Sequence, residues 1–274
     1  DLVFKDDTGK EVRLKAPAKR IVALAPHIAE SLYAVGAGSQ LVGTVDYSDY
    51  PPEAKKVARV GGYSRVDLEA VAALKPDLVL AWESGNNMNQ VDKLKALGLT
   101  VYVSQPNRME DVAGQLERLG QLAGTENVAK AAADRFRQRI ESLRKANAGK
   151  PPVRVFYQIW KTPLMTVGGP QIISDAIKLC GGENVFGQIN KMAPTVSVEA
   201  VLEANPEAII ATGMGDARPD WLGDWDQWTQ LLAVKRKNLF HINPDIMQRH
   251  TPRILDGAEK LCAALDTARQ HRPR

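Results

Sequence analysis

The sequence predicts an α/β protein built from two Rossmann-like lobes, each with a mostly parallel sheet, joined by one long α-helix. Three observations lead to this prediction. Short apolar runs alternate with helical patterns, part of the sequence recurs in the same order, and a segment free of proline and glycine separates the two copies. Strands that alternate with helices are typical of parallel sheets covered on both faces. At 274 residues the chain is long enough for two such lobes.

The internal repeat is the most informative of these observations. One stretch recurs with seven identical residues at a constant offset, so that Val66 matches Val196 and Glu69 matches Glu199. The matched pairs are VDLEAVAALKPDLVLAWESG (66–85) with VSVEAVLEANPEAIIATGMG (196–215), VGAGSQLVG (35–43) with LCGGENVFG (179–187), and VYVSQP (101–106) with LFHINP (239–244). Three matches in one order indicate two copies of one structural unit.

The first copy reads as strands and helices in alternation. Short apolar runs bounded by proline or glycine are typical of buried strands, and a 3.6-residue period is typical of helices. Pro76 and Gly98 end two of the helices, because these residues interrupt helical patterns. We expect strands at 21–24, 41–45, 78–81 and 101–103, and helices at 30–35, 68–74 and 91–97. The second copy repeats this order over 153–240, and a terminal helix is expected from about Pro252 to Ala268.

The segment between the copies predicts a single long helix. Residues 125–148 contain no proline or glycine, are rich in alanine and alternate in charge, which gives a helix of about six turns. Pro151 and Pro152 end it. We therefore expect an N-terminal lobe at 1–124, a connecting helix at 125–150 and a C-terminal lobe at 151–274. A continuous helix should allow less hinge motion than a flexible Gly/Ser linker.

Composition excludes several classes of protein. The net charge is +4, from 36 basic and 32 acidic residues, which is too balanced for a nucleic-acid binder with clustered positive charge. No apolar run approaches the ~20 residues that a membrane span needs. The mixture of 44% hydrophobic and 25% charged residues is that of an ordinary globular protein.

The two cysteines give information on the cellular compartment of the protein. Cys180 and Cys262 are each the last residue of a Lys-Leu-Cys tripeptide on a predicted amphipathic helix, and neither belongs to a CxxC pair. One disulfide is favoured, with two free buried thiols as the alternative, and a disulfide indicates an exported protein. The chain begins at Asp1 and shows no charged-then-apolar leader, so we expect that a signal peptide was cleaved or that the sequence was trimmed.

Motifs for catalysis or nucleotide binding are missing from the sequence. It contains no GxxxxGKS or GxxxxGKT, no GxSxG elbow, and no HExxH or HxH spacing among its four histidines. We therefore expect a protein that is not an enzyme and has no metal site. A hydrolase or chelatase that uses His27 and His250 is the rival of a different class, but these residues lack a nucleophile–base spacing.

Aromatic residues make up only 6% of the chain, yet several follow predicted strands or precede helices. Loops at the carboxyl ends of parallel strands form a binding crevice, and aromatic side chains there make flat apolar walls. As a set they favour a ligand cleft over a module that binds only other proteins. The set comprises Tyr47, Tyr50, Tyr63, Trp82, Trp160, Trp221, Trp225 and Trp228. His27, at the end of a predicted strand, could reach the same cleft.

Four longer segments resemble a known family. TVDYSDYPPEAKK (44–56), LEAVAALKPDLVLAW (68–82), LCGGENVF (179–186) and RHTPRIL (249–255) are similar to the substrate-binding proteins of ABC importers whose lobes are joined by one helix, most of all to the cobalamin-binding group. The resemblance implies a periplasmic, monomeric protein that holds a cobalt corrinoid in the cleft between its lobes and delivers it to a permease dimer. It implies no cofactor beyond the transported ligand. Members of the group also carry a disulfide in the second lobe, which fits Cys180 and Cys262.

The resemblance also assigns roles to residues. The docking glutamates of the family, one per lobe, which engage arginines of the permease, fall on Glu69 and Glu199. The ligand-contacting positions that match or lie nearby are Tyr47, Trp82, and the run Asp245, Ile246, Met247, Gln248 and Arg249. We expect the ligand residues to follow strands or precede helices.

Several positions depart from the cobalamin-binding pattern. A family tryptophan is Tyr63 here, a phenylalanine is Met165, a second-lobe tryptophan is Ala193, and His27 replaces a small residue. Tyr63-Ser64-Arg65 resembles the Tyr-x-Arg of haem-binding importers, in which a phenolate binds ferric iron and an arginine such as Arg65 pairs with a propionate. Haem is therefore an alternative ligand. A ferric siderophore is a third candidate, because the small excess of basic residues suits its anionic groups weakly.

Overall fold

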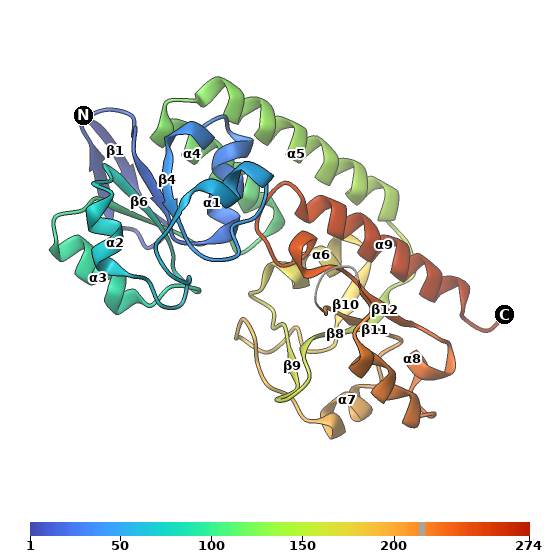
Figure 1. The fold of residues 1–274 in the computed structure, drawn as a ribbon. Helices are drawn as coiled ribbons and strands as arrows, with labels where there is room; N and C mark the ends of the chain where they lie inside the picture. Colours follow the sequence, from blue (N-terminus) through green and yellow to red (C-terminus); the bar gives the residue numbers. More distant parts are fainter. Residues whose placement is uncertain (214–216) are drawn as a thin grey trace. The chain divides into compact units, whose positions relative to one another are not determined.

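The computed structural model describes residues 1–213 and 217–274, which form two compact units (Figure 1). Unit 1 comprises residues 1–106 and 110–137, and unit 2 comprises residues 107–109 and 138–274. Met214 and Gly215, which end the second copy of the longest repeat, lie outside the described residues. No helix in the described ranges is both long and apolar enough to cross a membrane.

Unit 1 contains a five-stranded parallel sheet in the order β5-β4-β3-β6-β7. Alternate side chains of β3, β6 and β7 pack with Val71, Val91 and Leu94 of α2 and α3 into one apolar core. An antiparallel hairpin, β1 with β2, precedes the sheet. The strands are β1 (Leu2–Lys5), β2 (Glu11–Leu14), β3 (Ile21–Ala23), β4 (Leu41–Thr44), β5 (Ala58–Arg59), β6 (Leu78–Trp82) and β7 (Val101–Ser104). The helices are α1 (Pro26–Ala34), η1 (Gly38–Gln40), η2 (Pro52–Lys56), α2 (Leu68–Ala73), α3 (Met88–Ala96) and α4 (Met109–Ala123).

Unit 2 contains a sheet in the order β10-β8-β11-β12, all parallel, with β9 added antiparallel to β8. Its core includes Phe156, whose ring meets those of Phe186 and Trp225 edge to face. The strands are β8 (Val153–Trp160), β9 (Met165–Thr166), β10 (Gly182–Asn184), β11 (Ala208–Ala211) and β12 (Leu239–His241). The helices are α6 (Ile172–Leu179), α7 (Val198–Ala204), η3 (Asp220–Gln227), α8 (Leu232–Lys235), η4 (Pro244–Ile246) and α9 (Ile254–Gln270).

The two sheets have the same topology, and the predicted fold class is confirmed. The strand order β4-β3-β6-β7 of unit 1 corresponds to β10-β8-β11-β12 of unit 2, as the repeat in the sequence requires. The expected long helix is α5 (Glu126–Asn147), which runs from the residues of unit 1 into those of unit 2.

Several elements were not expected from the sequence, among them the β1–β2 hairpin, β5, β9 and α4. Helix α4 contains Gly114 and Gly120, which weaken a helical pattern. Gly120 has a packing role, because a Cβ at this position would lie 2.3 Å from the Cβ of Ala129 on α5. Its missing side chain thus allows α4 and the start of α5 to approach closely. His241 is the exposed last residue of β12.

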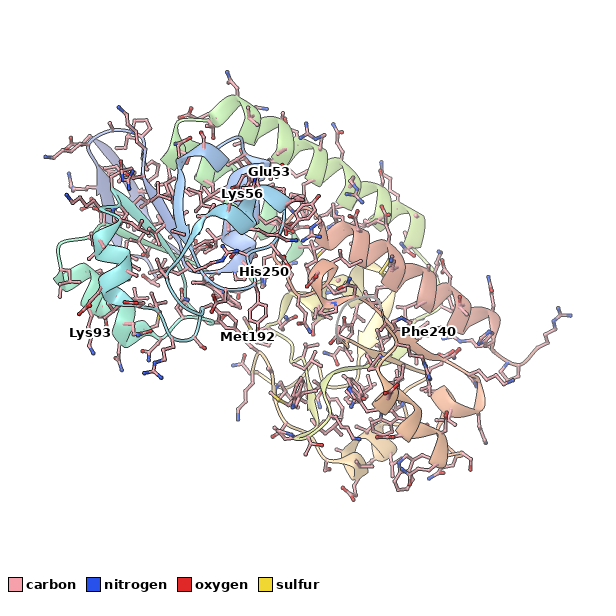
Figure 2. All side chains as sticks on the ribbon, viewed as in Figure 1. Glu53, Lys56, Lys93, Met192, Phe240 and His250 are labelled. Carbon is pink, nitrogen blue, oxygen red and sulfur yellow. A yellow bond between two sulfur atoms is a disulfide. The ribbon has the colours of Figure 1, made fainter. Side chains whose placement is uncertain are left out.

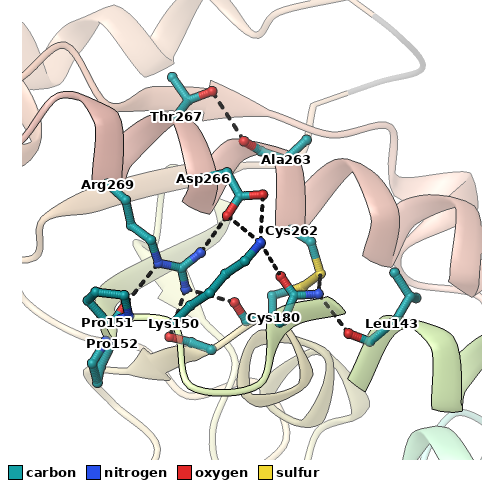
Figure 3. Close-up of polar contacts among 12 residues, drawn as sticks. Leu143, Lys150, Pro151, Pro152, Cys180, Cys262, Ala263, Asp266, Thr267 and Arg269 are labelled. Atoms are coloured by element: carbon teal, nitrogen blue, oxygen red, sulfur yellow. Dashed lines mark hydrogen bonds and ion pairs between the residues drawn. A yellow bond between two sulfur atoms is a disulfide. The ribbon is translucent and has the colours of Figure 1, made fainter. Parts of the chain in front are cut away.

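A disulfide links α6 to α9 in unit 2, as the cysteines predicted. Cys180 and Cys262 are both buried and close a loop with a sequence separation of 82. Polar contacts surround the bond (Figure 3): Arg269 Nη2 donates to the Cys180 carbonyl at 2.9 Å, and both Arg269 and Lys150 pair with Asp266. Partial burial acts to raise the pKa of Asp266, but hydrogen bonds from Lys150 and Arg269 outweigh it and lower the pKa.

Removing the disulfide should destabilise the protein. In the C180A/C262A variant the unfolded chain regains the entropy of an open loop, so we expect the free energy of unfolding to fall by about 2–4 kcal/mol. Urea denaturation followed by circular dichroism at pH 7 without reductant measures the change. The wild-type protein treated with reductant is the control and should approach the variant. A loss below about 0.5 kcal/mol would contradict the stabilising role of the bond.

Candidate ligand-binding site

An aromatic cluster lies at the carboxyl edge of the unit 1 sheet. Trp82 is the last residue of β6, Tyr63 follows β5, and His27 is the second residue of α1 after β3. The rings of His27 and Trp82 meet edge to face at 5.0 Å, and those of Tyr63 and Trp82 are tilted at 5.8 Å. His27 is only 3% exposed, whereas Tyr63 is 40% exposed. The structure therefore brings three of the predicted residues together, with Tyr63 and part of Trp82 open to a ligand.

Asn86 holds this cluster in place. Its Oδ1 accepts a hydrogen bond from the Trp82 backbone N–H at 2.6 Å, and its Nδ2 donates to the carbonyls of Leu24 at 2.9 Å and Tyr63 at 2.7 Å. Asn86 is 8% exposed, so its amide replaces the water that these backbone groups would otherwise need. One side chain thus ties together the ends of β3 and β6 and the loop after β5.

Gly85 makes room for the tryptophan ring. A Cβ at Gly85 would lie 1.9 Å from Trp82 Cε3, so the indole rests directly against the glycine backbone. The sequence repeat already included Gly85, but it gave no reason to single out Asn86, which positions the backbone of the aromatic cluster. Its only signal is a polar residue that closely follows a buried strand.

Tyr47 and Arg65 lie on two further loops of unit 1. Tyr47, in the loop after β4, is 77% exposed and has φ 68°, a region that bulky residues rarely adopt. Arg65 is exposed and closes a tight turn, in which its backbone N–H and carbonyl both pair with Gly62. This turn presents Tyr63 between its two ends. Both loops thus project predicted ligand residues into solvent.

Unit 2 places its predicted residues in two segments. Met165 was expected in a loop but lies in β9, where it is half-buried opposite Trp160. Asp245 belongs to η4, and its Oδ1 lies 3.6 Å from Nη2 of Arg249, whose side chain is 13% exposed. Gln248 Nε2 donates to Thr212 Oγ1 at 3.1 Å, which ties this segment to the residue after β11.

Two other residues of this segment differ in exposure. Ile246 is half-buried, whereas Met247 is fully buried and packs against Gly257 of α9, so Met247 has no side-chain surface for a ligand. His250, labelled in Figure 2, precedes α9 and is also buried, at 3% exposed. Among the described residues there is no group of three or more His, Cys, Asp or Glu side chains that could hold a metal ion.

Glu69 and Glu199 occupy equivalent places in the two units. Each is the second residue of a short helix, α2 or α7, and each side chain is exposed. Asp67 and Ser197 cap these helices, and each accepts a hydrogen bond from a backbone N–H at 3.1 Å. A glutamate in the first turn is also favourable for the helix dipole. The two helices thus present matching carboxylates on the surfaces of their units.

Two cavities within the units lie apart from the predicted ligand residues. One of about 430 Å³ in unit 1 is lined by α4 and the end of β7, including Tyr102 and Arg118, and burial raises the pKa of Tyr102 to about 12. Another of about 840 Å³ in unit 2 is lined by Ser174, Asp175 and Asn184. Neither contains a residue of the aromatic cluster or of the 245–249 segment.

Two parallel sheets of equal topology, with polar and aromatic residues at their carboxyl edges, define a two-unit binding protein. The chain belongs to the periplasmic binding protein family, whose sequence profile matches residues 21–246. It is 37% identical to the vitamin B12-binding protein of Vibrio cholerae serotype O1 over 255 residues, which cover 93% of this chain and 91% of that protein. It is also 37% identical over 245 residues to the vitamin B12-binding protein of Yersinia pestis, covering 89% of this chain and 85% of that protein.

Solved structures of periplasmic binding proteins also superpose on this chain. The crystal structure of the periplasmic vitamin B12-binding protein BtuF of Vibrio cholerae superposes with a TM-score of 0.85 at 36% identity, covering 93% of this chain and 99% of that one. The periplasmic haem-binding protein BhuT superposes with a TM-score of 0.81 at 21% identity, covering 92% of this chain and 99% of that one. At that identity BhuT supports the fold alone. The family and these relatives are binding proteins rather than enzymes.

Replacing Asn86 with alanine should loosen the aromatic cluster. The N86A variant leaves one backbone N–H and two carbonyls without their partner, so we expect a loss of about 2–3 kcal/mol in the free energy of unfolding. Tryptophan emission should shift to longer wavelength as Trp82 gains contact with water. N89A, an exposed asparagine on α3, is the matched control and should change neither quantity. Equal stability and emission in N86A and N89A would refute the positioning role of Asn86.

Proposed function

We propose that the protein is the substrate-binding component of an ABC importer and that it captures a corrinoid such as vitamin B12. The single observation that carries this proposal is similarity over 93% of the chain to proteins named for vitamin B12 binding. We infer further that the protein acts in the periplasm as a monomer after export, and that it has no catalytic activity and no cofactor of its own. The cobalt then arrives within the ligand.

In this proposal the ligand contacts the carboxyl edges of both sheets. A corrin is a flat macrocycle with amide side chains, so it needs an apolar wall and several hydrogen-bonding groups. Trp82 and Tyr63 supply the wall, and Asp245, Gln248 and Arg249 supply donors and acceptors for amides. The full proposed set is His27, Tyr47, Tyr63, Arg65 and Trp82 from unit 1, and Met165, Asp245, Ile246, Met247, Gln248 and Arg249 from unit 2. The buried Met247 acts by fixing its segment against α9.

Haem is the second candidate because of one specific residue. Tyr63 is 40% exposed, beside Trp82, and a phenolate oxygen is a suitable ligand for ferric iron. A ferric siderophore, which also contains Fe(III), is a third candidate. The similarity to vitamin B12-binding proteins favours the corrinoid over both.

Calorimetric titration distinguishes these ligands. We expect the purified protein to bind cyanocobalamin and to bind hemin and a ferric hydroxamate much more weakly. W82A should raise the Kd for cyanocobalamin about 5- to 150-fold, equivalent to about 1–3 kcal/mol for one lost aromatic wall. Leu97, which is 60% exposed at the end of α3, gives the control variant L97A, with an unchanged Kd.

The Y63F variant separates a corrinoid from haem. It should leave the cyanocobalamin Kd almost unchanged, because the ring remains. Loss of hemin binding in Y63F, with a changed charge-transfer spectrum, would instead identify haem as the ligand. An unaltered affinity of W82A for every ligand tested would place the site elsewhere.

We also propose that Glu69 and Glu199 dock the protein onto the two permease subunits. The support is their equivalent, exposed position on α2 and α7. Two related carboxylates suit a partner with twofold symmetry.

Charge reversal tests this docking. E69R and E199R should each reduce cyanocobalamin transport at least about tenfold in reconstituted vesicles, because like charges then face the permease arginines. The calorimetric Kd for cyanocobalamin should stay within twofold of the wild-type value. E126R, at the exposed start of α5, is the control and should transport normally. Normal transport by both E69R and E199R would rule out the docking role.

A further inference from the structure

Trp160 belongs to the aromatic set of the sequence analysis, but it is not among the proposed ligand-binding residues. It is the last residue of β8, and 58% of its surface is accessible. A single exposed aromatic residue is common on protein surfaces and by itself indicates nothing. What distinguishes Trp160 is the way its neighbours hold it.

Hydrogen bonds fix Trp160 at both its ring and its backbone. The indole Nε1 donates to the Thr162 carbonyl at 3.0 Å, and the Trp160 carbonyl accepts a hydrogen bond from Gln158 Nε2 at 3.3 Å. Gln158 is only 2% exposed, and its Oε1 accepts from Nε1 of the buried Trp225 at 2.8 Å. The polar end of the ring is thus satisfied within the loop while its apolar surface stays open. A ring held in this way loses little conformational entropy when a ligand covers it.

The strand register places Trp160 beside a proposed ligand residue. Trp160 lies opposite Met165 in the antiparallel pair β8–β9, directly after a shift of register between Gln158 and Trp160, and Met165 in turn bridges to Thr195. Residues directly opposite in such a pair project from the same face with Cβ atoms about 5 Å apart. The exposed indole therefore lies next to a proposed ligand residue on the adjacent strand.

The place of Trp160 in the duplicated fold also supports a contact with the ligand. β8 of unit 2 and β3 of unit 1 occupy the same place in the two sheets, and His27 follows the carboxyl end of β3. Trp160 ends β8, and the Thr212 N–H that follows β11 donates to the Gln158 carbonyl at 3.1 Å. Trp160 therefore belongs to the carboxyl edge of its sheet, as the aromatic cluster belongs to that of unit 1.

We propose that Trp160 is the aromatic wall that unit 2 presents to a flat macrocyclic ligand, with Met165 extending its apolar surface. This inference rests on the proposed function and adds to it a contact residue that determines affinity for the macrocycle. The alternative, that the ring contacts the permease, is an outcome of the test.

Titration of three variants with cyanocobalamin tests the proposal. W160A should raise the Kd about 5- to 50-fold and W160F by less, because phenylalanine keeps part of the wall. K161A, whose exposed lysine is the next residue in the same loop, should leave the Kd unchanged. The melting temperature of W160A should stay close to that of the wild type, since the ring is exposed, so a weaker affinity would not reflect unfolding. Bound cyanocobalamin should also quench less of the tryptophan emission in W160F than in the wild type.

Three other results would contradict the inference, and each has a different meaning. If the wild type binds cyanocobalamin and W160A binds it equally well, Trp160 is not a ligand wall, while the proposed function stands. Reduced transport with an unchanged Kd in W160A assigns the ring to the permease and refutes the ligand role. If the wild type itself does not bind cyanocobalamin, the proposed function fails and this inference fails with it.

Discussion

Two buried side-chain amides organise the carboxyl edges of the sheets. In unit 1, Asn86 joins the backbone at Leu24, Tyr63 and Trp82. In unit 2, Gln158 joins the Trp160 carbonyl to the indole of Trp225. Strand ends leave backbone groups without a ladder partner, and burying such groups unpaired costs free energy. The amides meet this requirement and at the same time fix the neighbouring aromatic rings, so the candidate site depends on them.

The duplicated fold keeps some features and varies others. Both units retain the strand order and a capped short helix with an exposed glutamate at its second position. The edge chemistry differs: unit 1 gathers the rings of His27, Tyr63 and Trp82, whereas unit 2 offers the ring of Trp160 and an ion pair between Asp245 and Arg249. Equivalent surfaces suit a symmetric partner, and unlike edges suit an asymmetric ligand. This division agrees with the proposed delivery of a corrinoid to a permease dimer.

The sequence predicted the scaffold better than the site. Alternating apolar runs located the main strands of unit 1 to within two residues, and the offset between Val66 and Val196 anticipated the shared topology. These signals are local or repeated, so one sequence is enough to read them. The β1–β2 hairpin and β9 lie outside the matched segments of the repeat. Helix α4 was not predicted because Gly120 interrupts its helical pattern, and only the structure shows that this glycine allows close packing against Ala129 of α5.

Site details depend on tertiary contacts that no sequence pattern encodes. Asn86 joins segments that are 62 and 23 residues away in the chain. The position of Trp160 depends on β9 turning back to pair with β8, an element that was not expected. Met247 was predicted as a ligand residue from its neighbours, but its packing against Gly257 is visible only in the folded chain.

Hydrogen exchange measured by mass spectrometry, with and without cyanocobalamin, tests most directly whether one ligand engages both carboxyl edges. The interpretation predicts slower exchange in peptides that follow the strands, at 46–50, 61–66 and 82–87 in unit 1 and at 160–166 and 243–249 in unit 2. Exchange in the β1–β2 hairpin and at the amino ends of the strands should not change. Slower exchange confined to one unit, or found only around the cavity lined by Tyr102 and Arg118, would contradict it.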